Sequence, residues 1–134
     1  MNSHLRMLAG ALALVLTVAG AARADQAPAP GRNCFLSNQW KNWSVPASGK
    51  GDVLYLRLNN NDIYRVDLAP GSGARRGANE FLINRVRGSN WICSAVDLDL
   101  SIGDNLGFHR PLIARSLRRL TPDEIAAIPR HERP

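Results

Sequence analysis

The sequence lacks the local motifs that mark common enzyme classes. It has no G-x-S-x-G turn for a nucleophilic serine, no C-x-x-C pair for redox or zinc chemistry, and no internal repeat. Histidine is scarce, because beyond the first 24 residues it occurs only at His109 and His131. The glycines of Gly71-Ser72-Gly73 are followed by neither a lysine nor a strand-to-helix pattern, which argues against a phosphate-binding loop.

The sequence also lacks an apolar run that is long enough to span a membrane. The longest run extends from Met7 to Ala22, short of the roughly 20 residues that a spanning helix needs. Arg6 precedes this run, and Ala22-Arg23-Ala24 ends it with the small-x-small pattern of a cleavage site. We therefore interpret residues 1–24 as a signal peptide. We predict a periplasmic or secreted protein with no transmembrane segment in the mature chain.

Acidic residues are few relative to basic ones, with 11 Asp and Glu against 17 Lys and Arg. Cleavage after Ala24 removes Arg6 and Arg23 but no acidic residue, which lowers the formal net charge from +6 to +4. This balance favours anionic partners such as membrane headgroups, acidic glycans or nucleic acid. Of these three, nucleic acid is the least favoured partner for an exported protein. A net charge of +4 can also serve only to keep the protein soluble, and we favour this interpretation over an anionic partner.

Cysteine is limited to Cys34 and Cys93. In an oxidising compartment, an even number of cysteines without a metal-binding pattern indicates a disulfide. The bridge would close a loop of about 60 residues and stabilise the fold by roughly 4 kcal/mol in the chain-entropy model. That is a large share of the 5–15 kcal/mol that is typical for a domain. We expect neither a metal nor a cofactor.

Apolar residues alternate with polar ones along much of the chain, which predicts a mainly β protein. We expect a flexible linker over residues 25–32, a single β-rich domain over 33–128 and a tail over 129–134. Such strands would form a small antiparallel sheet, a sandwich or a partly open barrel. The candidate strands are Val53–Leu58, Ile63–Leu68, Phe81–Arg87, Trp91–Ile102 and Pro111–Leu120.

The sequence also predicts one turn and one helix start from residues with known roles in these structures. The turn formers Asn59-Asn60-Asn61-Asp62 join the first two candidate strands into a hairpin. Thr121-Pro122-Asp123-Glu124 has the cap, the proline and the acidic residue of a helix start, and Pro129 ends this short C-terminal helix. The tail from His131 onward is expected to be loose.

Four residues could support catalysis or metal binding. Asp97 and Asp99 have the spacing that places two carboxylates on one face of a strand, and Asp104 and His109 flank a glycine-containing turn. One hypothesis is therefore a small periplasmic hydrolase or metal-dependent enzyme that uses Asp97, Asp99, Asp104 and His109. We favour a solvated strand face that is balanced by arginines, and we assign no catalytic residue.

The arginines support another hypothesis, in which a basic surface holds an anionic component of the cell envelope. A contiguous arginine surface would favour this hypothesis, whereas a pocket that joins His109 to the aspartates would favour an enzyme. Scattered charges would favour a non-catalytic binding or structural protein, whose partner could be another periplasmic protein. The candidate anion-binding residues are Arg75, Arg76, Arg85, Arg87, Arg115, Arg118 and Arg119.

Four segments carry a family resemblance. They are Cys34-Phe35 followed by Trp43, Asp62–Leu68, Gly88–Ser94 and Ser116–Ile125. Together they resemble a family of short exported bacterial proteins, domain of unknown function 6491, over residues 33–128. The resemblance implies export and a small β-rich fold, and it implies no activity, cofactor or partner.

The chain departs from this family in its cysteines. Members often have four, and the two that are missing here would fall near residues 69–71 and 110–111. The absence of both implies that those two pair with each other in the family. The resemblance therefore implies that the remaining pair, Cys34 and Cys93, is linked. Our preferred interpretation is an exported, disulfide-linked binding or structural protein of the cell envelope without catalytic activity.

Overall fold

The structure is a computed structural model that describes residues 34–47 and 49–134. The predicted signal peptide (1–24) and linker (25–32) lie outside the described residues. The strands are β1 (Phe35–Leu36), β2 (Trp40–Ser44), β3 (Val53–Leu58), β4 (Ile63–Leu68), β5 (Glu80–Asn84), β6 (Trp91–Ile92), β7 (Leu100–Asp104), β8 (His109–Leu112) and β9 (Ala114–Arg119). The helices are α1 (Pro122–Ala127) and the 3-10 turns η1 (Ser37–Gln39), η2 (Ala95–Asp97) and η3 (Arg130–Glu132).

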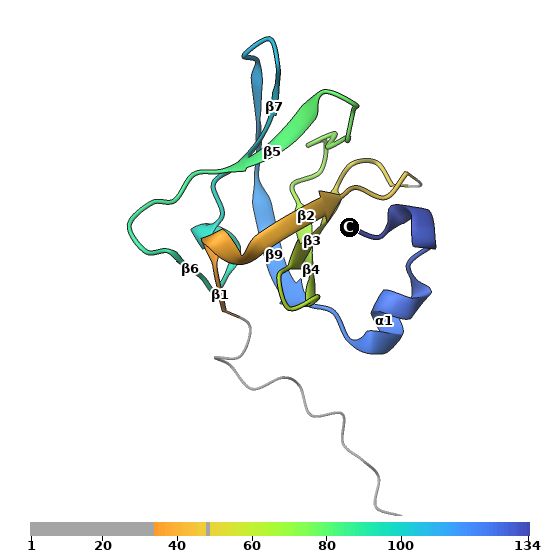
Figure 1. Ribbon diagram of the computed structural model, residues 1–134. Helices are drawn as coiled ribbons and strands as arrows, with labels where there is room; N and C mark the ends of the chain where they lie inside the picture. Colours follow the sequence, from red (N-terminus) through yellow and green to blue (C-terminus); the bar gives the residue numbers. More distant parts are fainter. Residues whose placement is uncertain (1–33, 48) are drawn as a thin grey trace, which may run out of the picture.

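These strands form three antiparallel sheets (Figure 1). The large sheet has the order β2-β3-β4-β9, the second sheet has the order β5-β7-β8, and β1 pairs with β6. The chain crosses from the second sheet to the large sheet between β8 and β9, at the exposed Ile113. The prediction of a mainly β fold with a short C-terminal helix is confirmed, and the sheets do not close into a barrel.

The predicted hairpin of β3 and β4 has the expected bounds. Leu54 lies opposite Val66 and Leu56 opposite Tyr64, and all four side chains are buried. Asn61 in the connecting turn has a φ of 66°, a conformation that asparagine tolerates better than most residues. The alternation of apolar residues therefore sets which face of the large sheet turns toward the core.

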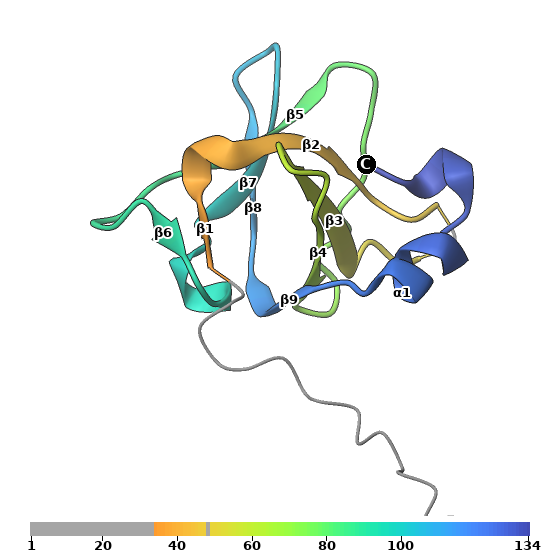
Figure 2. The ribbon, with the colours of Figure 1, turned by 60° about the horizontal axis from the view of Figure 1, so that its bottom comes forward.

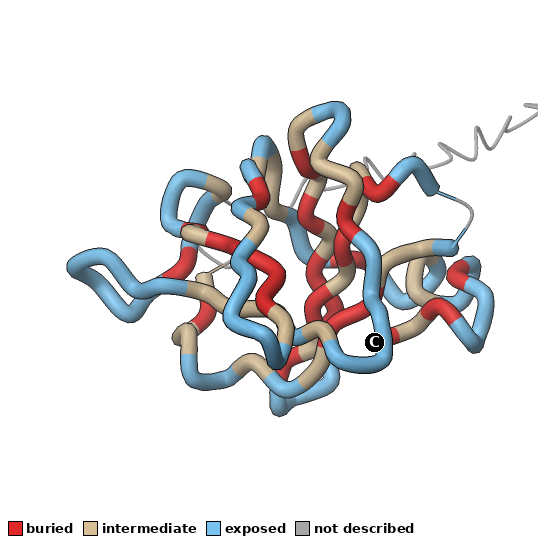
Figure 3. The backbone as a smooth tube through the Cα atoms, turned by 90° about the horizontal axis from the view of Figure 1, so that it is seen from above, coloured by how far each residue is buried: buried red, intermediate tan, exposed pale blue. Residues whose placement is uncertain are grey.

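The core lies between the large sheet and the second sheet. Leu100, Ile102 and Leu112 of the second sheet belong to the same buried cluster as the inward residues of β3 and β4. Buried residues accordingly gather along the strands in the middle of the molecule, whereas the loops around them are exposed (Figure 3). One face of the large sheet is thus covered by the second sheet.

The C-terminal helix α1 packs over a second cluster formed by Ile63, Leu120 and Ile128. Its start is the predicted one: the Glu124 N–H donates to Thr121 Oγ1 at 3.3 Å, and the Thr121 N–H donates to a Glu124 carboxylate oxygen at 2.9 Å. These reciprocal bonds satisfy two backbone donors that a helix start leaves free. No helix among the described residues is long and apolar enough to cross a membrane.

The prediction of one long strand over Trp91–Ile102 is wrong. The segment contains β6, the 3-10 turn η2 and the start of β7. The Asp97 carboxylate accepts hydrogen bonds from the Cys93 N–H at 3.0 Å and the Ser94 N–H at 2.9 Å, which closes a turn where the ladder would have continued. Local hydrogen bonding by Ser and Asp thereby competes with the extended conformation.

The prediction of one last strand over Pro111–Leu120 is correct only in part. The segment is divided between β8 and β9, which belong to different sheets. Pro111 lies in β8, an edge strand of the second sheet, where the missing N–H of proline is tolerated.

The tail is packed against the domain and is not loose as expected. The Ser44 hydroxyl donates to the backbone oxygen of Glu132 at 2.5 Å, and the Ala47 N–H donates to its carboxylate at 3.0 Å. The Arg133 side chain donates to the backbone oxygens of Ile128 and Ala126. The C-terminal segment therefore folds back from α1 to the loop after β2 (Figure 2).

The predicted disulfide joins Cys34 and Cys93, whose Cα atoms are 4.1 Å apart. It lies beside the two-residue pairing of β1 with β6, in which Phe35 faces Ile92. Phe35 and Ile92 are both buried in the main core. Two backbone pairs alone hold these strands weakly, so the covalent bond fixes the N-terminal segment of the described chain to the core.

We expect that replacing both cysteines with alanine lowers the free energy of unfolding by about 4 kcal/mol, because the bridge closes a loop of 59 residues. Cys93 is exposed and Cys34 is only half-buried, so the substitutions leave little cavity and report the loss of the cross-link. Urea denaturation of the oxidised protein and the double variant measures the difference. Reductant should destabilise the wild type and leave the variant unchanged, and equal midpoints for the oxidised proteins would contradict the prediction.

Candidate functional site

The candidate site lies at the open end of the β3–β4 hairpin. The chain enters β3 from the loop after β2 and leaves β4 into a second loop, and antiparallel pairing places these two loops side by side. The Leu68 N–H donates to the Asp52 backbone oxygen at 2.7 Å, and the Ala74 N–H donates to that of Gly51 at 3.0 Å. Between the loops is a cavity of about 570 Å³, lined by residues 45–47, 49–51 and 73–76.

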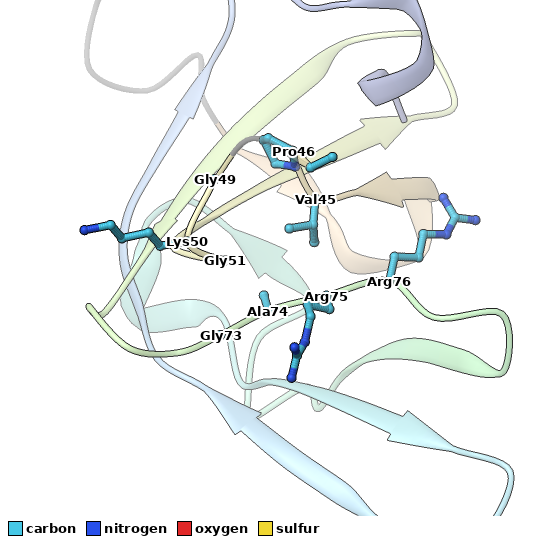
Figure 4. A pocket seen from close by; sticks show the side chains of 10 residues that line it. Val45, Pro46, Gly49, Lys50, Gly51, Gly73, Ala74, Arg75 and Arg76 are labelled. Atoms are coloured by element: carbon cyan, nitrogen blue, oxygen red, sulfur yellow. The ribbon is translucent and has the colours of Figure 1, made fainter.

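The cavity, which we call the basic cavity, has cationic but no acidic lining residues. Lys50 comes from one loop, whereas Arg75 and Arg76 come from the other, and their side chains spread around the rim (Figure 4). Arg76 is held in place: its guanidinium donates to the Trp43 backbone oxygen at 2.5 Å and lies 5.3 Å from the centre of the Trp43 ring. Lys50 and Arg75 are exposed.

The two loops approach so closely at Gly51 that a side chain cannot fit. Gly51 is buried and has a φ of +76°, and a Cβ there would lie 2.5 Å from both the nitrogen and the oxygen of Ala74. Those atoms belong to the backbone and cannot move aside as a flexible side chain would. Glycine at position 51 is therefore required for the two loops that carry Lys50 and Arg75 to approach this closely.

The structure separates the seven arginines that the sequence analysis proposed as one surface. Only Arg75 and Arg76 among them line the basic cavity. Three others lie next to carboxylates on other parts of the surface. These ion pairs are Arg87 with Asp99 at 2.8 Å, Arg118 with Glu124 at 2.7 Å and Arg119 with Asp62 at 2.5 Å. Arg85 and Arg115 are exposed, one after β5 and the other in β9.

Asp97 and Asp99 do not share a strand face, because Asp97 lies in η2 and Asp99 precedes β7. Hydrogen bonds from the Cys93 N–H, the Ser94 hydroxyl and the Ser94 N–H lower the pKa of Asp97 below its usual value. Asp99 forms the ion pair with Arg87. The carboxylate of Asp97 therefore stabilises the turn beside the disulfide, and Asp99 ties the preceding loop to β7.

Asp104 and His109 do lie together, at a small cavity of about 140 Å³ that Glu80 also lines. An Asp104 carboxylate oxygen accepts from the Leu106 N–H at 2.9 Å and the Phe108 N–H at 3.0 Å, which forms the tight turn between β7 and β8. Asp97 and Asp99 do not line this cavity. Across residues 34–47 and 49–134, no group of three or more His, Cys, Asp or Glu residues could hold a metal ion.

Lys50 was missed in the sequence analysis, although a signal for it exists. It stands between Gly49 and Gly51, three positions before the start of β3 at Val53, and the hairpin was predicted with its correct bounds. The ends of paired antiparallel strands lie side by side, so the loop with Lys50 could have been placed near the loop with Arg75. To identify this site from the sequence, the positive charges of Lys50 and Arg75 had to be considered together with the antiparallel pairing of the hairpin.

We expect Gly51→Ala to destabilise the protein much more than Gly71→Ala. Both glycines have positive φ, 76° and 80°, so each substitution costs about 1–2 kcal/mol in backbone strain. Only Gly51 adds the clash with Ala74, because no atom lies within 4 Å of a Cβ at position 71. The clash should add a further 1–3 kcal/mol. Chemical denaturation of both variants checks this, and equal losses would contradict the close approach of the loops.

No family model, no curated protein and no solved structure matches the chain.

Proposed function

We propose that this protein is an exported, non-catalytic binding protein of the cell envelope that holds an anionic polymer at its basic cavity. One observation carries the proposal: a cavity of about 570 Å³ is surrounded by Lys50, Arg75 and Arg76 with no carboxylate among its lining residues. These cations would attract a negatively charged occupant. The volume lies within the range of small-molecule sites in proteins.

The placement of the cations favours a ligand with several negative groups. The three side chains stand around the rim and do not converge on one point (Figure 4). A polymer with repeated phosphate, sulfate or carboxylate groups could contact all of them, whereas a single small anion could not. Arg76, which is fixed against Trp43, would provide an ordered contact, and the exposed Lys50 and Arg75 would adapt to the spacing of the anionic groups.

We expect Lys50→Gln combined with Arg75→Gln to weaken binding to heparin and to polyphosphate by about tenfold. Each exposed ionic contact contributes up to about 1 kcal/mol, and 1.4 kcal/mol corresponds to a factor of ten. The matched control is Arg85→Gln with Arg115→Gln, which removes the same charge from exposed positions outside the cavity.

Fluorescence anisotropy with labelled polymers at low and at physiological salt provides the measurement. The control variant should bind nearly as tightly as the wild type. Equal weakening of the two variants would show that only overall charge matters, and it would contradict a site at the basic cavity.

The proposal includes export, supported by the leader-like residues 1–24 and by the Cys34–Cys93 disulfide, which is typical of oxidising compartments. We expect the protein recovered from the periplasm or medium of a bacterial host to begin at Asp25. Intact-mass measurement under non-reducing conditions tests both features at once. A recovered species that retains Met1–Ala24, or that has two free thiols, would contradict export with oxidation.

We also propose that the chain belongs to the domain of unknown function 6491 family. The segments named in the sequence analysis support this membership. The linkage of Cys34 to Cys93 is consistent with this membership. Membership adds nothing about the ligand, which rests on the basic cavity alone.

A further inference from the structure

A second cavity, of about 380 Å³, lies on the outer face of the large sheet, beneath α1 and the C-terminal segment. Its floor includes Tyr55 of β3, Arg65 of β4 and Arg118 of β9, which are neighbours in one row across the sheet. Leu120 and Ile128 provide an apolar wall. We call it the outer cavity, and it does not depend on the basic cavity or on its proposed ligand.

Glu132 lies at one end of this row. Its backbone oxygen accepts from the hydroxyl of Ser44, the residue that faces Tyr55 on β2. The side chain is only 10% exposed, and its carboxylate accepts from the Ala47 N–H. Among the described residues, the nearest basic side chain is the exposed His131, whose Nε2 is 3.9 Å away and which is charged only when protonated. A carboxylate this buried with so little compensation is costly, and a cation in the cavity would offset the cost.

Two arginines lie at the other end of the row. Arg65 and Arg118 face each other directly on neighbouring strands, an arrangement that is unfavourable for like charges. Each donates to one carboxylate, Arg65 to Asp67 at 2.7 Å and Arg118 to Glu124 at 2.7 Å. A guanidinium has five N–H groups, so each keeps donors for a further acceptor. Glu124 also lines the cavity beside Arg118, so a ligand carboxylate at this end would share the donors of the two guanidinium groups with Glu124 and Asp67.

We propose that the outer cavity binds a short zwitterionic peptide, with its ammonium group at Glu132 and its carboxylate at Arg65 and Arg118. The positive and negative ends of the cavity are separated by Tyr55, over which the peptide lies. From β2 to Arg65 on β4 the row covers two strand spacings, about 10 Å, and Arg118 on β9 lies one spacing further. A dipeptide extends about 7 Å, and the long Glu and Arg side chains close the remaining distance. A single amino acid, at about 3.5 Å, would leave roughly 6 Å for the side chains to close, against roughly 3 Å for a dipeptide.

The first test uses the wild-type protein and four probes in isothermal titration calorimetry. L-alanyl-L-alanine or its D,D isomer should bind with a measurable affinity. The N-acetylated form lacks the ammonium and the C-amidated form lacks the carboxylate, and each should bind at least tenfold more weakly. The stronger isomer indicates whether the peptide comes from protein or from cell-wall material. Absence of binding by both isomers, or equal binding of the blocked forms, would overturn the proposal.

Variants locate the site. Glu132→Gln keeps an oxygen for the Ala47 N–H but removes the charge, so it should weaken the dipeptide at least tenfold and leave the N-acetylated form unchanged. Arg118→Gln should weaken the dipeptide and leave the C-amidated form unchanged. The control Arg115→Gln, on the same strand but outside the cavity, should bind normally. Unaltered dipeptide binding in both site variants would place the peptide elsewhere.

Two controls distinguish a loss of dipeptide binding from unfolding of the variant and from a change at the basic cavity. The thermal midpoint of each variant shows whether it is folded, and if a variant is not, the blocked probes on the wild type still decide the question. Polyphosphate binding should be the same in Glu132→Gln and in the wild type, because Glu132 does not line the basic cavity. In the wild type, absence of polymer binding would contradict only the proposed function, and absence of dipeptide binding would overturn only the proposal for the outer cavity.

Discussion

The antiparallel pairing of β3 with β4 positions the residues on which both cavities depend. Its inward residues, such as Leu54 and Val66, are fully buried and form the centre of the core. Its outward residues, Tyr55 and Arg65, form part of the floor of the outer cavity. Its open end brings together the loops that carry Lys50 and Arg75. A shift of one residue in this register would exchange the two faces and disrupt the core and the outer cavity together.

The C-terminal segment also positions residues that line the cavities. Residues after α1 return to the end of β2, where Ser44 and Ala47 donate to Glu132. These bonds hold the loop that follows β2, and Pro46 of this loop lines both cavities. The two cavities thus share one short segment, and the charged lining residues are only cationic in one cavity and of both signs in the other.

Local sequence patterns predicted those features that depend on neighbours in the chain. The β3–β4 hairpin follows from strict alternation around an Asn-rich turn, and α1 follows from the Thr121–Glu124 cap. The turn at Ser94–Asp97 has a similar Ser-x-x-Asp signal, which the apolar alternation of the surrounding residues concealed. The disulfide needed little more than the cysteine count, because with only two cysteines there is one pairing.

Local sequence patterns did not predict the features that depend on tertiary packing. Nothing in the last six residues indicates that Glu132 would be buried against β2, because its partners are a backbone N–H and a hydroxyl 85 and 88 positions away. The division of the Pro111–Leu120 segment between two sheets depends on how the sheets pack. The seven arginines were grouped by type, whereas the fold separates them and brings two of them to Lys50.

The shared loop has a thermodynamic consequence. A ligand that orders the segment around Pro46 from one side lowers the conformational entropy that the second ligand must remove from the other side. The two occupants are then coupled through the same few residues without any change in the shape of the sheets. By reciprocity, each occupant would alter the affinity of the other by the same factor. In this small domain, cooperativity between a polymer and a peptide would require only the one loop that lines both sites.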